Sequence, residues 1–173
     1  MTDINEVIKV IGEVKSLRRS GWIKRNVSLP ESDADHQWGV AFLALLYADE
    51  ALDKLKCLKL ALVHDIQECI CGDFTLVDEI TPEQKHQLEL AAITEIARRL
   101  NFPELADLFD EFEEQKTAEA KFVKGLDKLE TVCQAQYYDN HKQAPAPLIP
   151  EFKSYAERTV KDETAKRLLS EIV

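Results

Sequence analysis

Two neighbouring ionisable residues, His64 and Asp65, end one of the most apolar segments of the chain. Burying an unpaired polar group costs about 1–3 kcal/mol, so these side chains are expected to have partners. His36 and Asp127 also lie on or beside apolar stripes of helical spacing. Two imidazoles and two carboxylates without a thiolate suit one divalent ion: Mn²⁺, Co²⁺, Fe²⁺, Zn²⁺ or, less well, Mg²⁺. The residue types therefore indicate a metal centre made of these four side chains.

Two further acids follow the His-Asp pair and suggest what such a centre would do. Glu68 comes four residues after His64, and residues so spaced are neighbours on a helix surface. Asp73 follows directly after Gly72, where the helix is expected to stop, on the same edge. A divalent ion can polarise a phosphoryl oxygen and activate water, and Glu68 would accept or shuttle the proton. The pattern favours metal-assisted hydrolysis of a phosphate ester.

Each of these residues also has an ordinary structural explanation. A single histidine on an apolar helix face is usually a core side chain with a satisfied hydrogen bond. Asp127 stands beside Lys124 and Lys128, as a surface carboxylate would. A His-Asp dipeptide arises often by chance. Composition and spacing alone therefore leave a metal site and a purely structural role both open.

Length and charge limit the classes of partner. The chain has 173 residues, enough for one domain with a sizeable core, and we expect residues 1–173 to form a single domain. Its net charge of −10 argues against binding long nucleic acid, which depends on neutralising phosphates. A small anionic substrate held by local cations and a metal is still compatible. No run approaches the ~20 apolar residues of a membrane span, so no membrane partner is expected.

The cysteines and the N-terminal segment indicate the compartment. The four cysteines form no CxxC pair, which favours free thiols in a reducing cytoplasm. The first residues are acidic and lack the apolar core of a signal peptide. We therefore expect a cytoplasmic protein.

Nearly every segment of the chain has the apolar spacing of a helix. Asp33 is a plausible N-cap, Thr81 with Pro82 predicts another helix start, and Gly72 predicts a helix end. The expected fold is an all-α, single-domain bundle of about six or seven helices. The expected helices cover residues 3–18, 33–52, 53–71, 81–100, a short stretch after Pro103, 117–138 and 151–170.

Four stretches resemble the motifs of one family: residues 31–36 (ESDADH), 61–68 (ALVHDIQE), 72–73 (GD) and 120–130 (AKFVKGLDKLE). The ordered H…HD…D set with its E and GD is similar to the HD-domain phosphohydrolase superfamily, within it to the 5′-deoxynucleotidase branch. The resemblance covers about residues 15–140. It implies a helical, HD-domain-like, metal-dependent phosphomonoesterase that acts on deoxynucleoside 5′-monophosphates.

The resemblance also implies a role for each matching position. His36, His64, Asp65 and Asp127 match the ligands of one divalent metal ion. Glu68 matches the acid that handles the nucleophilic water, Asp73 a catalytic-site residue near the sugar and its 3′-hydroxyl, and Trp22 a tryptophan against the deoxyribose.

The chain departs from some relatives at Gly21, where they have an arginine that helps to bind phosphate. Arg18, Arg19, Lys24 and Arg25 are nearby replacements, of which we assign Arg18 and Arg25 to the predicted substrate site. This departure leaves the metal set intact and the exact substrate open.

Relatives form homodimers, and a homodimer is expected here. An exposed apolar edge at residues 148–152 could supply the contact, and Trp38 with Phe42 is expected in the core or in dimer packing.

Two other functions stay open. One is a different reaction of the same superfamily, such as a cyclic-nucleotide or alarmone phosphodiesterase or a triphosphohydrolase. The other is a non-catalytic binding module that keeps a metal for stability, although such a module has no need of Glu68 and Asp73.

Overall fold

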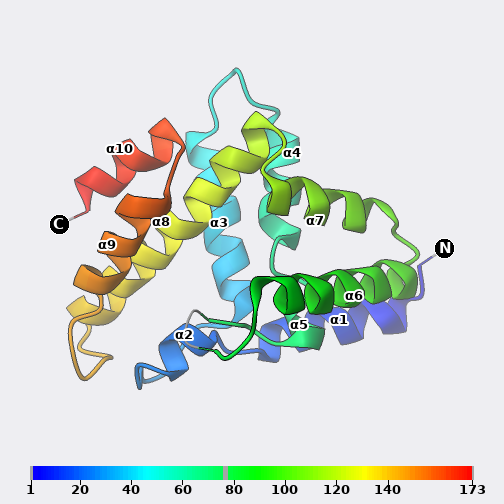
Figure 1. Ribbon diagram of the computed structural model, residues 1–173, viewed down its shortest axis with the longest axis horizontal. Helices are drawn as coiled ribbons and strands as arrows, with labels where there is room; N and C mark the ends of the chain where they lie inside the picture. Colours follow the sequence, from blue (N-terminus) through cyan, green and yellow to red (C-terminus); the bar gives the residue numbers. More distant parts are fainter. Residues whose placement is uncertain (1, 76–77, 173) are drawn as a thin grey trace.

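The computed structural model describes residues 2–75 and 78–172. These residues form ten helices and no strand, so the all-α prediction is confirmed (Figure 1). The helices are α1 (Ile4–Ser16), α2 (Ser20–Ile23), α3 (Asp33–Tyr47), α4 (Lys54–Val63), α5 (Glu68–Cys71), α6 (Pro82–Leu100), α7 (Glu104–Glu114), α8 (Ala118–Asn140), α9 (Ile149–Thr159) and α10 (Glu163–Glu171).

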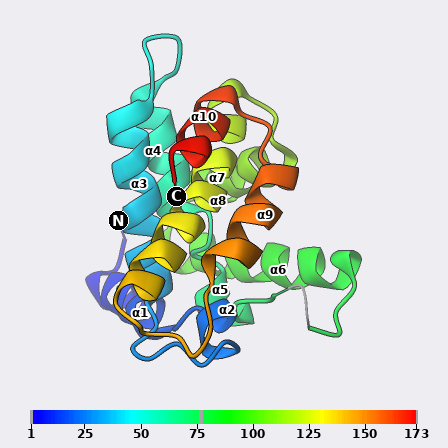
Figure 2. The same cartoon turned by 90° about the vertical axis from the view of Figure 1, so that its left-hand side faces the viewer.

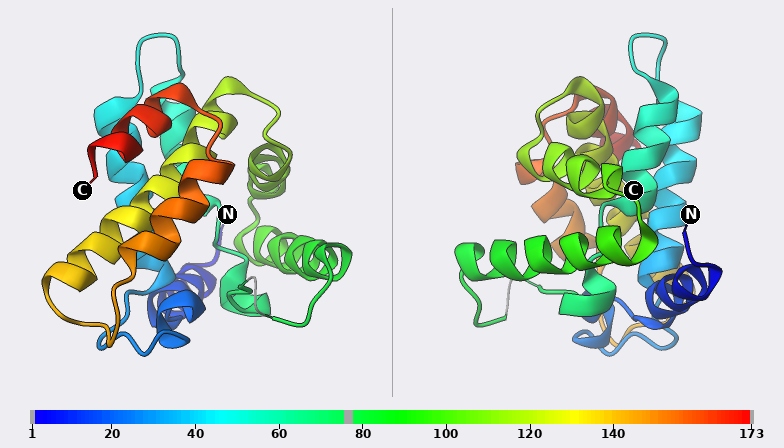
Figure 3. Two further views of the ribbon diagram at one scale, coloured as in Figure 1. Left: turned by 60° about the vertical axis from the view of Figure 1, so that its left-hand side comes forward. Right: turned by 90° about the vertical axis from the view of Figure 1, so that its right-hand side faces the viewer.

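The centre of the molecule is formed by α3, α4 and α8, which pack on one another. Figure 2 shows α3 and α4 side by side, and Figure 3 shows α9 lying along α8. Their shared core consists of small and branched apolar side chains, among them Val40, Leu60, Leu126 and Val132, each essentially inaccessible to solvent. Burial of such side chains supplies about 1.5–3 kcal/mol each, which fixes how these three helices sit.

A second core lies at the base, where α1 and α6 run side by side (Figure 1). Val10 and Val14 of α1 meet Ile93 and Ile96 of α6 and Phe109 of α7. The short α2 belongs to a third cluster with the end of α8 and the start of α9. The segment that carries α2 is therefore anchored against the end of α8 and the start of α9.

The helix signals in the sequence were right at several boundaries. Thr81 caps α6 with a complete capping box and Pro82 in the first turn, and Thr117 caps α8. Gly72 ends α5 with a φ of 89°, a conformation that suits glycine. Ser32, not Asp33, is the N-cap of α3, because its hydroxyl accepts from the Asp35 backbone N–H.

Two expected helices are each broken, which is why the number of six or seven was too low. The segment 53–71 leaves the α-helical pattern after Val63, where Ile66 and Glu68 donate their N–H groups to carbonyls three residues back. The segment 151–170 breaks at Val160, and Asp162 caps a new helix by accepting from Ala165 N–H. The short α2 also forms within the stretch expected as a loop.

One expectation about apolar surfaces was wrong. Leu148 is buried against the α2 cluster, and Phe152 packs on Trp22, so these two side chains belong to the interior and not to an exposed edge. Trp38 and Phe42, expected in the core or in dimer packing, lie outside the core, with 65% and 46% of their surface exposed, and dimer packing stays a prediction. Among the described residues, no helix combines the length and the apolar character needed to cross a bilayer.

Candidate metal centre

Four predicted ligand residues meet where α3, α4 and α8 come together. His36 projects from α3, His64 is the C-cap of α4, Asp65 follows it, and Asp127 lies on α8. His36 Nε2 is 3.3 Å from His64 Nε2, 3.4 Å from Asp127 Oδ1 and 3.8 Å from Asp65 Oδ2. His64 Nε2 is also 3.3 Å from Asp65 Oδ2. The structure thus brings ligand atoms of His36, His64 and Asp65 within 4.8 Å of one another, and Asp127 adjoins them through its contact with His36.

These separations fit a single divalent ion. Two ligand atoms bonded to one ion at about 2.1 Å stand about 3.0–3.4 Å apart in neighbouring positions and at most about 4.2 Å apart across the ion. Both rings are oriented by their other nitrogen: His64 Nδ1 is 2.9 Å from the Ala61 carbonyl oxygen, and His36 Nδ1 is 2.5 Å from Glu130 Oε2. The two Nε2 atoms are therefore left to face the centre. The donor set of nitrogen and oxygen atoms matches Mn²⁺, Co²⁺, Fe²⁺ or Zn²⁺.

The electrostatics of the centre also favour a cation. Burial opposes ionisation of Asp65, but His64 and Arg19 hold its pKa below the ordinary value. The pKa of Asp127 is likewise lowered, against burial, by Lys128 and the two histidines. Burial and Arg19 oppose a charged His36, yet Glu130 and Asp127 raise its pKa to about 10. A metal ion would replace the proton that His36 otherwise holds.

Two cations reach this centre: Lys128, which pairs with Asp127 at 3.0 Å, and Arg19. Arg19 Nη1 lies 2.9 Å from Asp65 Oδ2, 3.9 Å from Glu68 Oε2 and 3.8 Å from Asp33 Oδ1. An antiparallel bridge between Arg18 and Ser32 holds this extended segment, in which adjacent side chains point to opposite sides. Arg19 was one of four cations considered, and nothing in their types distinguished it.

The two arginines assigned to the substrate site point elsewhere, which corrects that assignment. Arg18 is exposed, donates to the Pro30 carbonyl and lies 3.8 Å from Asp35. Arg25 pairs with Glu151 and lies over the Phe152 ring. Because neither is in contact with the metal centre, neither replaces the missing arginine at Gly21.

A second group of acids adjoins the centre: Asp33, Glu68 and Asp73, whose nearest carboxylate oxygens lie within 4.8 Å of one another. Asp73 Oδ2 accepts from Ser20 N–H at 2.6 Å. Both oxygens of Asp33 and Oε2 of Glu68 are buried without a hydrogen-bond partner in the described parts of the chain. Burial raises the pKa of Asp33 to about 7 and that of Glu68 well above its ordinary value. Asp33 was missed, because its place at the start of a helix suggested a cap.

Trp22 does not offer a face to this centre. Only 2% of its surface is exposed, and its ring packs against Tyr138 and Phe152 at centroid distances of 5.2 and 4.6 Å. Its Nε1 donates to Glu31 Oε1 at 2.8 Å. The expected stacking against a sugar is therefore wrong for the ring as it stands, and its role here is to pack α2 against α8 and α9.

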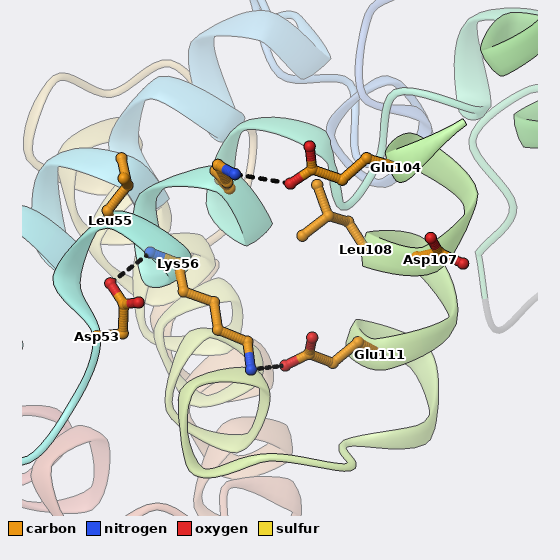
Figure 4. A pocket seen from close by; sticks show the side chains of 8 residues that line it. Asp53, Leu55, Lys56, Glu104, Asp107, Leu108 and Glu111 are labelled. Carbon is orange, nitrogen blue, oxygen red and sulfur yellow. Dashed lines mark hydrogen bonds and ion pairs between the residues drawn. The ribbon is translucent and has the colours of Figure 1, made fainter. Parts of the chain in front are cut away.

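Two hollows differ in what they could hold. One of about 790 Å³ opens beside Asp73 and Ser20, between α2 and the start of α6, with Phe74 and Leu88 in its wall. The other, of about 280 Å³, lies between α4 and α7. Ion pairs span it: Figure 4 shows the one between Lys56 and Glu111, which is 2.7 Å long. A second joins Lys59 to Glu104. Of the two hollows, only the first is lined by an acid of the second group, Asp73, and by Ser20, the residue that follows Arg19.

Known proteins are similar to this chain over most of its length. The model of a family described as HD domain matches residues 11–168. The chain is 43% identical over 154 residues to 5′-deoxynucleotidase HDDC2 of Xenopus laevis, covering 87% of this chain and 77% of that protein. It is 41% identical over 146 residues to the Homo sapiens protein of that name, covering 83% and 72%. A crystal structure of a Pyrococcus horikoshii protein matches with a TM-score of 0.81 and 30% identity, covering 98% of each chain.

Proposed function

The chain belongs to the HD domain family, and on that premise we propose that it is a metal-dependent phosphomonoesterase that hydrolyses deoxynucleoside 5′-monophosphates. One observation carries the proposal: ligand atoms of His36, His64 and Asp65 cluster together, Asp127 lies 3.4 Å from His36, and the guanidinium of Arg19 contacts Asp65. A metal site and a fixed guanidinium side by side are what a phosphate monoester needs. The relatives named 5′-deoxynucleotidase narrow the substrate class.

The proposed metal ligands are His36, His64, Asp65 and Asp127. A bound divalent ion would polarise a phosphoryl oxygen and lower the pKa of water at the site. The donor set leaves the ion's identity open, with Mn²⁺ and Co²⁺ preferred among the candidates.

The other groups would bind the phosphate and move the proton. Arg19 would donate hydrogen bonds to two phosphate oxygens, since guanidinium geometry matches such pairs. Glu68 would take a proton from the attacking water, for which a raised carboxyl pKa is suitable. The water oxygen bonds to phosphorus, the bond to O5′ breaks, and O5′ leaves with a proton. The products are a deoxynucleoside and inorganic phosphate.

The nucleoside would occupy the hollow beside Asp73. Asp73 is a charged acceptor suited to a 3′-hydroxyl, and its backbone neighbour Phe74 adds apolar surface. The metal and Glu68 act on phosphate, which all nucleotides share, so discrimination against a 2′-hydroxyl must come from this hollow. We expect a preference for deoxyribose and little preference among bases.

A nucleotide panel tests this proposal. Released phosphate is measured for the deoxynucleoside monophosphates, AMP, deoxynucleoside triphosphates and cyclic nucleotides at one pH. Fastest release from the monophosphates, abolished by a chelator and restored best by Mn²⁺ or Co²⁺, supports it. Turnover that survives chelation contradicts metal dependence, and activity on cyclic nucleotides or triphosphates alone indicates another reaction of the family. Asp65→Ala should lose metal and activity together.

We also propose a homodimer in the cytoplasm. Four apolar side chains share one exposed face of α3: Trp38, Phe42, Leu45 and Leu46. The rings of Trp38 and Phe42 are stacked at 5.3 Å. Exposed apolar patches of this kind commonly mark protein interfaces. Sedimentation should show a dimer, and Phe42→Glu should shift it to 19.7 kDa.

The cytoplasmic location is supported by the cysteines. All four cysteines are free thiols, as is usual in a reducing cytoplasm.

A further inference from the structure

Glu130 lies on α8, three residues after Asp127, and makes the closest polar contact of His36. Its Oε2 is 2.5 Å from His36 Nδ1, and only 7% of its surface is exposed. His36 is fully buried, so this contact is not shared with bulk solvent. We propose that Glu130 is a positioning residue that aims His36 at the metal, and that Gly39 is present to leave room for it. The inference rests on the proposed metal centre.

The contact with Glu130 decides which nitrogen of His36 can bind a metal. With Nδ1–H donating to the carboxylate, the lone pair of a neutral imidazole is on Nε2. That atom is the one 3.4 Å from Asp127 Oδ1 and 3.3 Å from His64 Nε2. A carboxylate behind a metal-binding histidine also makes its ring a stronger ligand. Glu130 therefore fixes both the direction and the basicity of His36.

Another acid is close by but is held by other groups. Glu31 lies near the same pair, within 4.8 Å of ligand atoms of both His36 and Glu130. Its Oε1 accepts from Trp22 Nε1, and its backbone N–H donates to the Tyr138 hydroxyl. Among the described residues, His36 Nδ1 therefore has Glu130 as its one hydrogen-bond partner.

Gly39 explains how Glu130 fits between α8 and α3. It lies three residues after His36, in the middle of α3, where glycine costs about 1 kcal/mol relative to alanine. A Cβ at this position would lie 2.7 Å from Glu130 Oε1, 2.9 Å from its Cγ and 3.0 Å from its Cδ. Three such contacts along one side chain cannot be relieved by moving its tip. Any larger residue at position 39 would displace the carboxylate from His36.

Gly12 provides a matched control. It also lies within a helix, α1, but a Cβ there would meet nothing within 4 Å. Gly12→Ala and Gly39→Ala therefore make the same chemical change, and both add helix propensity. Only the second would disturb the contact between Glu130 and His36.

The experiment is a double-mutant cycle on Mn²⁺ affinity, measured by titrating chelator-treated protein. Glu130→Ala and Gly39→Ala should each weaken Mn²⁺ binding by about 10–100-fold, the range for loss of such a supporting contact. Glu130→Gln, which keeps an acceptor without the charge, should lie between wild type and Glu130→Ala. Gly12→Ala should bind as the wild type does. Gly39→Ala should weaken binding little further in a Glu130→Ala background, because its effect acts through Glu130.

Several outcomes overturn the inference. Wild-type Mn²⁺ affinity in both Glu130 variants would do so, as would additive effects of Gly39→Ala and Glu130→Ala. Thermal unfolding of each variant in chelator distinguishes the positioning role of Glu130 from a merely structural one. A merely structural role would lower the stability of the variant but leave the Mn²⁺ affinity of the folded protein unchanged. If Gly39→Ala does not fold, the two Glu130 variants still decide the role of Glu130. Failure of the wild-type protein to bind Mn²⁺ would instead contradict the proposed metal centre.

Discussion

Arg19 Nη1 and Asp65 Oδ2 form an ion pair of 2.9 Å in which both side chains are largely buried. The same carboxylate oxygen faces His64 Nε2 at 3.3 Å. One aspartate thus joins a guanidinium to the candidate metal centre. Burial opposes the charge on Arg19, but the surrounding acids outweigh it and raise the pKa of Arg19 well above its ordinary value. A positive charge is therefore held beside the centre at every working pH.

Replacing Arg19 should weaken the binding of the substrate's phosphate group. Arg19→Ala should lower kcat/KM for dAMP by about 10–100-fold, the equivalent of one or two hydrogen bonds to a charged group. Arg19→Lys should recover only part of this loss, because lysine keeps the charge without the paired donors. Arg18→Ala is the control and should change kcat/KM little. Equal losses for the two alanine variants would contradict the assignment of the phosphate to Arg19.

Glu68→Gln should separate proton transfer from metal binding. The amide cannot accept the proton of the attacking water, so kcat should fall by about 10²–10⁴-fold. Mn²⁺ affinity should stay near that of the wild type, since Glu68 is outside the proposed ligand set. Glu95→Gln, on α6, is a control for charge alone. A variant that keeps full turnover, or that loses Mn²⁺ and turnover together, would show that Glu68 has a different role.

Asp33→Asn should stabilise the chelated protein at high pH. Burial raises the pKa of Asp33 to about 7, above its ordinary 3.8, so the folded state binds its proton more tightly than the unfolded state. The stability of the wild type is then lost progressively as pH rises from about 4 to about 7. The amide of the variant would not titrate, so its advantage in unfolding free energy should grow over this range, to at most about 4 kcal/mol at pH 8.

The measurement is denaturant unfolding in chelator at pH 5 and pH 8. Asp107→Asn, an exposed change on α7, serves as the comparison. If the stability gain of Asp33→Asn is no larger at pH 8 than at pH 5, the folded state does not disfavour the ionised form of Asp33.

Trp22→Phe should affect stability more than selectivity. The change keeps an aromatic ring between Tyr138 and Phe152 but removes the donor to Glu31 Oε1. Leaving that buried acceptor unpaired should cost about 1–3 kcal/mol in unfolding free energy. The ratio of kcat/KM for dAMP and AMP should not change. If the ratio of kcat/KM for dAMP and AMP changes more than kcat/KM for dAMP itself, Trp22 does contact the sugar.

Local signals in the sequence were enough for the helices that begin at a cap. Thr81 and Thr117 each supply a side-chain acceptor next to an apolar helical pattern, and both start helices. No glycine or proline stands at the breaks after Val63 and Thr159. Apolar spacing alone therefore predicted one continuous helix across each break. The breaks depend on hydrogen bonds three residues apart and on a cap by Asp162.

The candidate ligand residues could be selected from the sequence because their types are unusual on apolar helices. Arg19 could not be distinguished from Arg18, because the choice depends on an extended segment that pairs with residues 31–33. The burial of Trp22 and Leu148 depends on how α8 and α9 dock around α2, which no local pattern records. Contacts between distant segments therefore account for most of what the sequence alone missed.

The four candidate ligands come from three helices that meet only in the finished fold. An ion bound there would act as a cross-link between α3, the end of α4 and α8, each of which also supplies the central core. Ligand binding to the native state alone stabilises it by mass action, by about 2.7 kcal/mol at a hundredfold excess over Kd. Loading would therefore lengthen the lifetime of the chain as well as activate it. Metal starvation would then lower the amount of the protein in a cell, through faster proteolysis, and not only its turnover.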